Sequence, residues 1–442
     1  MAASLNRRQF LKAAAAAAVT GPFIGSSGAA SPNQRVRLAF IACGERAQQM
    51  LPMFLSAANT EIAALCDVNE PRMGLLRDAI QQLKPEQKPD MVIDYRSILD
   101  RKDVDGVVIA TTQHWHGLPH IHAAQAGKAI FVEKPLSHTV VEGRAMVQAS
   151  KKYGVHTIMG TQQRIGPSYQ QAVEVVRSGR LGKISLVECW NYHNTGQRAG
   201  RYEDSDPPAG LHWDRWLGPA PAVPYNRARM NNSWWFDYGG GMMTNWAIHH
   251  IDIILWAMND YSPKTVACSG GKFYVDDMAD TPDTIEASWE FDKWMMQYSY
   301  RGFSNFHIFQ SRPNHHGICF HGDKMTMLVD RFGYEIWEDN KRAEPIERVR
   351  AVPYFDPKDP MRSEQDGPFQ RLFVDSIREG KPPMIDIEHS HKATVCCHLA
   401  NIAYLTRSTV HWDGATETIA NNPAASALLA RPRRRGYELP SV

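Results

Sequence analysis

The sequence lacks a marked excess of charge of either sign. Its 442 residues include 49 Lys and Arg against 47 Asp and Glu, so the formal net charge is only +2. A chain so nearly balanced gives no electrostatic reason to expect a nucleic-acid partner or an anionic membrane surface. Hydrophobic residues make up 43% and charged residues 22%, as in ordinary soluble globular proteins. The chain has no internal repeats, and its length allows two or three domains.

The cysteines lack the spacing of a metal clip or a disulfide framework. There are seven, an odd number, and most lie in apolar runs. They are Cys43, Cys66, Cys189, Cys268, Cys319, Cys396 and Cys397. We expect most of them to be small buried residues, and no pairing is predicted.

The sequence also lacks an apolar run long enough to span a membrane once its N-terminus is removed. The run that ends near Ile24 is short and rich in Ala and Gly. It follows a twin-arginine pattern around Arg7 and Arg8, and small residues at 28–30 offer a cleavage site. We predict that residues 1–30 are a twin-arginine signal peptide and that the protein is periplasmic or otherwise extracytoplasmic. A cytosolic helix with two chance arginines is the alternative.

A strand-turn-helix pattern opens the remaining chain. Residues 35–42 are apolar and β-branched, as in a buried strand, and the following residues match G-x-G-x-x-G with Ala at the first and third positions. Gly44 keeps the central glycine, which allows the backbone to approach a pyrophosphate at a helix N-terminus. This turn predicts a dinucleotide site whose contacts are Ala42, Cys43, Gly44, Glu45 and Arg46.

Asp67 ends the second predicted strand, residues 61–66, and follows Gly44 by 23 residues. This is close to the spacing of the acidic residue that binds a ribose 2′-hydroxyl in dinucleotide folds. Because a carboxylate there repels a 2′-phosphate, we expect tightly bound NAD rather than NADP. The alternative is that Asp67 caps the next helix, ahead of Glu70 and Pro71.

Further strands are predicted at residues 104–110, 130–132 and 155–160, with helical patterns between them. Alternating strands and helices indicate a doubly wound parallel sheet, so residues 31–160 should form a Rossmann domain. Ligands bind at the carboxyl ends of such strands. The polar residues placed there, and expected to contact the cofactor, are Thr111, Thr112, His116, Glu133, Lys134 and Gln162.

Four histidines lie close together at His114, His116, His120 and His122. Such a cluster can bind a metal, but no carboxylate falls in the pattern and the stretch opens a helix inside the dinucleotide fold. We therefore predict no metal site. We expect His116 near the nicotinamide and the other three partly exposed.

The second half of the chain changes to consecutive strands. Extended runs at residues 183–192, 264–273, 284–291 and 294–300 have no helices between the last three, which indicates an antiparallel sheet. Residues 161–420 should form an α/β domain for substrate binding and oligomerisation, followed by a tail, 421–442, that is partly ordered on the surface.

Between these strands lie an irregular, tryptophan-rich segment, 193–238, and a glycine-led helix that begins near residue 239. Long loops in compact domains are usually functional, and clustered aromatic rings can be core or a platform for sugar rings. On the helix, Asn245, His249 and Asp252 share one face, which predicts that this face borders a site. A polar network inside the core is the alternative. We expect substrate to contact Lys134, Arg164, Trp235, Asn245 and His249.

The sequence resembles the Gfo/Idh/MocA family of sugar and cyclitol dehydrogenases over residues 35–410. The resemblance is carried by residues 42–47, Cys66-Asp67-Val68, Glu133-Lys134-Pro135 and the segment 239–252. It implies a Rossmann domain joined to an α/β domain with a large open sheet, and a homo-oligomer, either dimer or tetramer. It also implies functional roles for Lys134 and His249. The family usually has Asp four residues before that histidine, where this chain has Asn245.

Oxidation of a secondary alcohol needs a hydride acceptor, a base and a group that stabilises the alkoxide. His249 has a suitable ordinary pKa for the base, Lys134 can stabilise the alkoxide as a cation, and Asn245 can bind a hydroxyl but cannot take its proton. The sequence thus predicts an exported NAD-dependent oxidoreductase acting on a sugar, glycoside or cyclitol. One alternative is an NAD-dependent glycosidase that oxidises its substrate transiently; another is a non-catalytic sugar- or cofactor-binding protein.

Overall fold

The computed structural model describes residues 35–192, 198–306, 315–338, 344–350, 366–383 and 385–442. The predicted signal peptide lies outside these residues, so it stays a prediction. In the described part, no helix is both long and apolar enough to cross a bilayer.

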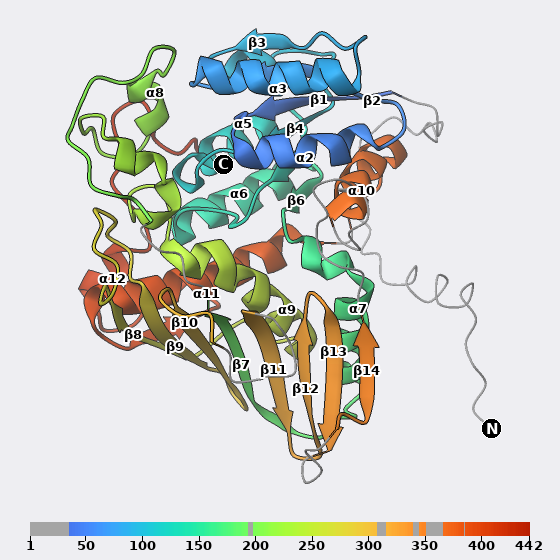
Figure 1. The fold of residues 1–442 in the computed structure, drawn as a ribbon, viewed down its shortest axis with the longest axis vertical. Coiled ribbons are helices and arrows are strands. Elements are labelled where there is room, and N and C mark those ends of the chain that lie inside the picture. The colour runs from blue at the N-terminus through green and yellow to red at the C-terminus, as the bar shows by residue number, and fades with distance from the viewer. Residues whose placement is uncertain (1–34, 193–197, 307–314, 339–343, 351–365, 384) are drawn as a thin grey trace.

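The N-terminal half forms a six-stranded sheet in which every pair of neighbouring strands is parallel (Figure 1). Its order is β3-β2-β1-β4-β5-β6. The strands are β1 (Val36–Ile41), β2 (Thr60–Cys66), β3 (Asp90–Val92), β4 (Gly106–Ile109), β5 (Ala129–Val132) and β6 (Thr157–Met159). The prediction of a doubly wound Rossmann sheet is confirmed.

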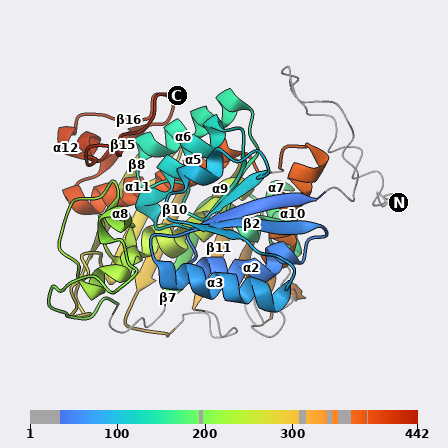
Figure 2. The ribbon, with the colours of Figure 1, turned by 90° about the horizontal axis from the view of Figure 1, so that it is seen from above.

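Helices cover both faces of this sheet, as Figure 2 shows from above. They are α2 (Glu45–Leu55), α3 (Glu70–Leu83), α4 (Arg96–Leu99), α5 (Gly117–Gln125) and α6 (Val140–Tyr153). Alternate residues of β1 enter different cores: Leu38 and Phe40 pack towards α2 and α3, whereas Ala39 and Ile41 pack towards α5 and α6. Strands buried on both faces explain the unbroken apolar runs in the sequence.

A helix from late in the chain completes this first domain. Helix α10 (Asp366–Glu379) packs against α2. Its Phe373 ring lies edge-on to Phe54 and Phe131, at centroid distances of 6.3 and 5.8 Å. The Rossmann core therefore includes side chains from far beyond residue 160.

The second sheet has ten strands in the order β14-β13-β12-β11-β7-β10-β9-β8-β15-β16. These are β7 (Ile184–Tyr192), β8 (Thr265–Gly271), β9 (Thr284–Glu290), β10 (Met295–Arg301), β11 (His316–Gly322), β12 (Met325–Asp330), β13 (Gly333–Glu338), β14 (Glu347–Arg350), β15 (Val410–Asp413) and β16 (Thr418–Ile419). Most neighbours are antiparallel, including the β9-β10 hairpin, but β7 and β10 pair in parallel. The predicted antiparallel pairing holds for the other neighbouring strands and is wrong for β7 and β10. The long chain between β7 and β8 lets β7 join the β8-β9-β10 meander from the side, without a hairpin.

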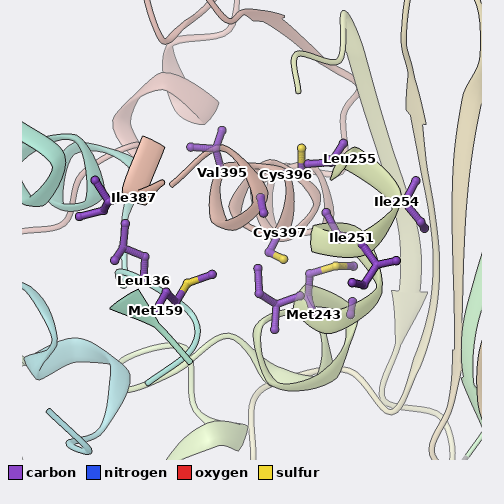
Figure 3. Packing of buried hydrophobic residues seen from close by; sticks show 14 of the residues in the cluster. Leu136, Met159, Met243, Ile251, Ile254, Leu255, Ile387, Val395, Cys396 and Cys397 are labelled. Atoms are coloured by element: carbon purple, nitrogen blue, oxygen red, sulfur yellow. The ribbon is translucent and has the colours of Figure 1, made fainter. Parts of the chain in front are cut away.

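Three helices lie against one face of the large sheet: α7 (Pro167–Arg177), α9 (Ile248–Met258) and α11 (Ile387–Thr406). Figure 1 shows α9 and α11 between the large sheet and the Rossmann domain. Met159 and Leu136 of the first domain pack in the same core as Ile251 and Cys397 of these helices (Figure 3). This shared core holds the two domains together and fixes the walls of the cleft between them.

The shorter elements include 3₁₀ turns at Gln113–Trp115, Gln162–Ile165, Arg227–Met230 and Asn232–Trp234. Two short helices, α8 (Trp213–Leu217) and α12 (Pro423–Ala427), complete the described part. All seven cysteines are free and all but Cys268 are buried, which confirms the expectation for most of them.

Candidate active site in the cleft between the domains

A cleft of about 1180 Å³ opens at the carboxyl ends of the parallel strands, where ligands bind in folds of this type. Both domains line it. Most of the residues that the sequence singled out are on its walls: Ala42, Gly44, Glu45, Arg46, Asp67, Thr111, Thr112, His116, Glu133, Lys134, Gln162, Asn245 and His249.

The turn after β1 has the backbone of a nucleotide-binding loop. Ala42, at the first glycine position of the fingerprint, has φ +78°, a conformation in the left-handed region that favours glycine. Gly44 is the N-cap residue of α2 and has no side chain to occupy the helix end, so the first amides of α2 remain available to a phosphate. Cys43 does not line the cleft, because its side chain is fully buried in the core.

Asp67 is held in place from both sides. One carboxylate oxygen accepts a hydrogen bond from the Cys43 amide at 2.7 Å, and the other accepts one from the Asn69 amide at 2.8 Å. The N-cap of α3 is Asn69, whose side chain binds the Arg72 amide, so Asp67 does not serve as the helix cap. Burial raises the pKa of Asp67, while the two amides oppose that rise. Its remaining lone pairs face the cleft, where they can accept ribose hydroxyls.

Lys134 follows β5 and reaches across to the second domain. Its Nζ donates to the backbone oxygen and to the Oδ1 of Asn245, each at 2.7 Å. Burial is the main reason that the pKa of Lys134 falls to about 8; the positive charges of Arg46 and Arg331 lower it further, and Glu133 opposes them. The pKa of the ammonium group therefore lies close to neutral pH, where the group can both hold and release a proton.

His116 braces the loop that carries Lys134. Its Nδ1 lies 2.7 Å from the Pro135 oxygen and its Nε2 lies 3.2 Å from the Thr111 oxygen. Burial lowers the pKa of His116. The ring thereby joins the loop after β5 to the loop after β4.

Arg46 and Glu133 form an ion pair beside this loop. The Arg46 Nε lies 2.9 Å from Glu133 Oε1, and the Glu133 side chain is only 8% exposed. The other oxygen of Glu133 accepts the Lys134 amide at 3.3 Å. The carboxylate therefore orders the turn, and its charge is balanced mainly by Arg46.

His249 and Asn245 come from a helix with an irregular start. Residues Met243–Ala247 form a π-helical turn that leads into α9, and such turns occur often at functional sites. The Nδ1 of His249 is buried and has no hydrogen-bond partner among the described residues. Burial and the charges of Lys134 and Arg331 place the pKa of His249 well below its usual range. The ring is therefore neutral near pH 7, and the same causes make it a weaker base than a free imidazole.

Two residues predicted to bind substrate do not line the cleft. Arg164 forms a buried bidentate ion pair with Asp252, with both N–O distances 2.7 Å. Asp252 therefore points to a partner inside the protein and not to the cleft. Trp235 is buried, donates its indole N–H to Ala228 at 3.2 Å, and stacks under Arg229. Its neighbour Trp234 lines the cleft instead.

The histidine cluster differs from the expectation of partly exposed side chains. His114 and His120 are buried, and burial lowers the pKa of each to about 3. His122 is half-buried and contacts the Tyr95 hydroxyl at 2.8 Å. The expected exposure is wrong for His114, whose ring meets the loop after β7 at the Trp216 oxygen, and for His120, whose ring contacts Ser150 of α6. It is right for His122. In the ranges that the structure describes, no group of His, Cys, Asp and Glu has metal-binding geometry.

Several lining residues escaped sequence reasoning. They are Arg72, Trp115, Trp234, Trp246, Arg331 and Tyr437. Trp234 and Trp246 fall in or beside the tryptophan-rich segment, whereas Trp115 lies among the four histidines. Arg331 is in the short turn between β12 and β13 and has no local signal. Its guanidinium lies 4.6 Å from the centre of the Trp246 ring, and only the fold brings these two together.

Comparison with known proteins agrees with this geometry. The Gfo/Idh/MocA family model described as "Oxidoreductase family, NAD-binding Rossmann fold" matches residues 36–161. The companion model, "Oxidoreductase family, C-terminal alpha/beta domain", matches residues 170–301. The two matched ranges together include Lys134, Asn245 and His249.

Curated relatives include an alpha-N-acetylgalactosaminidase of Shewanella oneidensis, 27% identical over 216 residues. A glycosyl hydrolase family 109 protein of Shewanella baltica is 29% identical over the same length. Each alignment covers 43% of this chain and 46% of the relative, so the chain spans about half the length of the curated relatives it matches.

Solved structures share the fold at low identity. A levoglucosan dehydrogenase bound to NADH and levoglucosan has a TM-score of 0.61 at 18% identity, covering 85% of this chain and 99% of its own. The aldose-aldose oxidoreductase of Caulobacter crescentus, bound to glycerol, has a TM-score of 0.62 at 20% identity, covering 86% and 100%. At this identity the likeness shows the fold alone.

Proposed function

Because the chain belongs to the Gfo/Idh/MocA oxidoreductase family, we propose that it uses NAD to oxidise a secondary hydroxyl of a sugar, glycoside or cyclitol. The observation that carries this proposal is the contact of Lys134 Nζ with Asn245, beside His249, in a cleft that also contains the nucleotide turn. The chain holds the nucleotide half through Gly44, the α2 amides and Asp67. These groups fit a dinucleotide, which supplies the hydride acceptor when bound.

The remaining residues divide the work on the substrate. His249, which lines the cleft beside Lys134 and has a neutral ring, takes the hydroxyl proton. Lys134, as an ammonium group, donates a hydrogen bond to the oxygen that becomes an alkoxide and then a carbonyl. Asn245 orients the Lys134 ammonium group, because its side chain accepts a hydrogen bond from Nζ. It also orients the substrate, because its amide can bind a second hydroxyl. Trp234 and Trp246 offer flat apolar faces to a sugar ring.

The proposal is tested by measuring bound nucleotide and turnover in the wild type, in Lys134→Ala and in Lys102→Ala. Denaturing the purified protein should release NAD, and Lys134→Ala should lower turnover by about 100- to 1,000-fold because it removes one donor to the developing oxyanion. Lys102→Ala is the matched control, since Lys102 is exposed and remote from the cleft. Full activity in Lys134→Ala would contradict the assignment. Bound nucleotide without turnover on any polyol or glycoside would favour the non-catalytic binding protein.

A second candidate is an NAD-dependent glycosidase. The curated relatives with glycosidase names favour it, as does Asn245 in place of the family's acid. A dinucleotide held by Gly44, the α2 amides and Asp67 would accept a hydride from a substrate hydroxyl and later return it, so none would be consumed. Between these two steps the neighbouring carbon would lose a proton, the glycosidic bond would break by elimination and water would add. Release of free nitrophenol from a nitrophenyl glycoside without added NAD distinguishes this candidate from a dehydrogenase.

We also propose that the protein is exported by the twin-arginine route and assembles as a homo-oligomer. The support for export is the Arg7-Arg8 pattern and the apolar run after it. Changing both arginines to lysine should leave the protein in the cytoplasm, as cell fractionation would show. Undiminished periplasmic protein would contradict this route. The support for a homo-oligomer is the large open sheet, which the family resemblance implies as the surface of association. Light scattering, which gives the molar mass in solution, would test it.

A further inference from the structure

The C-terminal segment returns to the cleft from the far side of the molecule. After α12 it runs along α6, where the Leu429 oxygen accepts the Val141 amide at 3.1 Å. Gly436 and Tyr437 then line the cleft. Figure 2 shows the chain ending beside α5 and α6, on the Rossmann side. The sequence predicted a partly ordered surface tail, but this part of it is a wall of the candidate active site.

Two arginines anchor the segment to different parts of the protein. Arg433 donates to Glu142 Oε1 at 2.9 Å, and the Glu142 side chain is fully buried. Arg434 binds Asp214 Oδ1 at 2.5 Å and donates from Nε to the Gly218 oxygen at 2.6 Å. Glu142 belongs to the Rossmann domain, whereas Asp214 and Gly218 belong to the loop after β7. The segment therefore ties the two walls of the cleft together.

These ion pairs also decide against another reading of the arginine-rich tail. A run of free arginines attracts phosphates of nucleic acids or lipids. Here Arg433 and Arg434 form ion pairs with carboxylates of this chain, and Arg431 donates to the Phe236 oxygen. These three arginines therefore attach the tail to the fold.

Tyr437 is placed where the adenosine part of a dinucleotide would lie. Its ring packs edge-on against Trp115, with ring centres 5.5 Å apart, and the Arg434 guanidinium lies 5.2 Å from its centre. Trp115 in turn lies edge-on to Tyr95, which follows β3. The same end of the cleft is lined by Asp67 and Asp94, after β2 and β3, the strand ends that approach the adenosine ribose in dinucleotide folds.

We propose that residues 431–437 form a strap that holds the adenosine end of the cofactor, with Tyr437 as a nucleotide-binding residue and Arg433 and Arg434 as its anchors. This inference rests on the proposed NAD function. The strap slows cofactor release. In the glycosidase reaction, where the hydride would return to the substrate ketone, one bound dinucleotide would then serve many turnovers. It acts through a fixed aromatic wall and needs no contact with the reacting atoms.

Release of bound NADH, followed by its fluorescence after an excess of NAD is added, tests the strap. Tyr437→Ala should release NADH about tenfold faster or more, because it removes an aromatic contact. Arg434→Met should act in the same direction by freeing the strap from Asp214 and Gly218. Arg435→Ala is the matched control, since Arg435 is exposed in the same segment, and it should release NADH at the wild-type rate. Turnover at saturating NAD should stay at the wild-type value in the Arg435→Ala control.

The outcomes separate this inference from the proposed function. Wild-type protein that binds no NAD or NADH would overturn the proposed function, and the strap with it. Wild-type protein that binds NADH, with Tyr437→Ala and Arg434→Met both folded by thermal unfolding and releasing it at the wild-type rate, would overturn the strap alone. If Tyr437→Ala does not fold, the release rate of Arg434→Met decides the matter. Equal acceleration by Arg435→Ala would show a general effect of tail charge and also overturn the strap.

Discussion

The two halves of the cleft differ in how their charges are balanced. In the nucleotide half, Asp67 is bound by two backbone amides and Glu133 by Arg46. In the catalytic half, the described lining residues after position 216 include Arg331 and no Asp or Glu, and Lys134 faces the neutral Asn245. The first half holds its carboxylates in fixed positions, whereas in the second half burial and nearby cations lower the pKa of a histidine and of a lysine.

This difference explains the direction of the pKa shifts. A buried lysine without a carboxylate partner loses the stabilisation that its charged form would have in water, and neighbouring cations add to that loss. The pKa of Lys134 falls to about 8 for these reasons, and that of His249 falls well below its usual value. Had the usual acid stood at position 245, both shifts would be smaller.

The largest expected effect comes from removing the proposed base. His249→Ala should lower turnover by roughly 100- to 10,000-fold, because positioned proton transfer supplies about that factor. Bound nucleotide should be unchanged, since the nucleotide half does not include this ring. Steady-state kinetics and nucleotide content should be measured together, with the exposed His411→Ala as control. Loss of cofactor along with activity would show that the halves are not separable.

The charge comparison can be reversed by Asn245→Asp. A carboxylate beside Nζ stabilises the ammonium group, so the pKa of Lys134 should rise from about 8. If cationic Lys134 stabilises the alkoxide, wild-type activity should fall as the pH rises through about 8. In the variant this alkaline limb should move upward by roughly one pH unit or more. A pH profile of kcat/KM measures it, and an unmoved limb would remove Lys134 as its cause.

In the nucleotide half, Asp67→Ser should weaken discrimination against NADP. The carboxylate repels a 2′-phosphate and binds the ribose hydroxyl, so its removal should narrow the NAD preference by roughly tenfold, about one charged hydrogen bond. Calorimetry with both cofactors gives the ratio. Asp78→Ser, on the exposed face of the helix α3 that follows, serves as the control. An unchanged ratio of the NAD and NADP affinities would show that residues other than Asp67 determine cofactor choice.

The smallest effect is expected at Ala42. Its φ of +78° costs roughly 1–2 kcal/mol relative to an ordinary conformation. Glycine removes that strain but loses more backbone entropy on folding, by roughly 0.5–1 kcal/mol. Ala42→Gly should therefore raise the free energy of unfolding by about 1 kcal/mol or less. Chemical denaturation measures this, and a clear loss of stability would show that the alanine methyl contributes needed packing.

Much of the nucleotide half could be predicted from sequence because its determinants are local. The turn at 42–47, Asp67 and Glu133-Lys134-Pro135 each follow a buried strand, and parallel strands bring their carboxyl ends to one edge. Cys43 was the exception, since alternation along the chain buries its side chain and leaves only its backbone near the site. Lys134 was predicted from its place after a buried strand, and Asn245 and His249 from their shared helix face. The family resemblance added roles for Lys134 and His249, and all three residues line the cleft.

What the sequence determined by itself was the alternation of strands and helices, the nucleotide turn and the identity of the catalytic candidates, because periodicity and short motifs depend on near neighbours. Only the tertiary structure decided which polar groups pair. It turned Arg164 and Asp252 into a buried ion pair, placed Trp234 rather than Trp235 on the cleft, paired β7 with β10 in parallel, and brought Arg331 and Tyr437 to the site. These contacts join residues that are distant in the chain. A buried polar group needs a hydrogen-bond partner, but many residues could serve, and only the fold determines which one does.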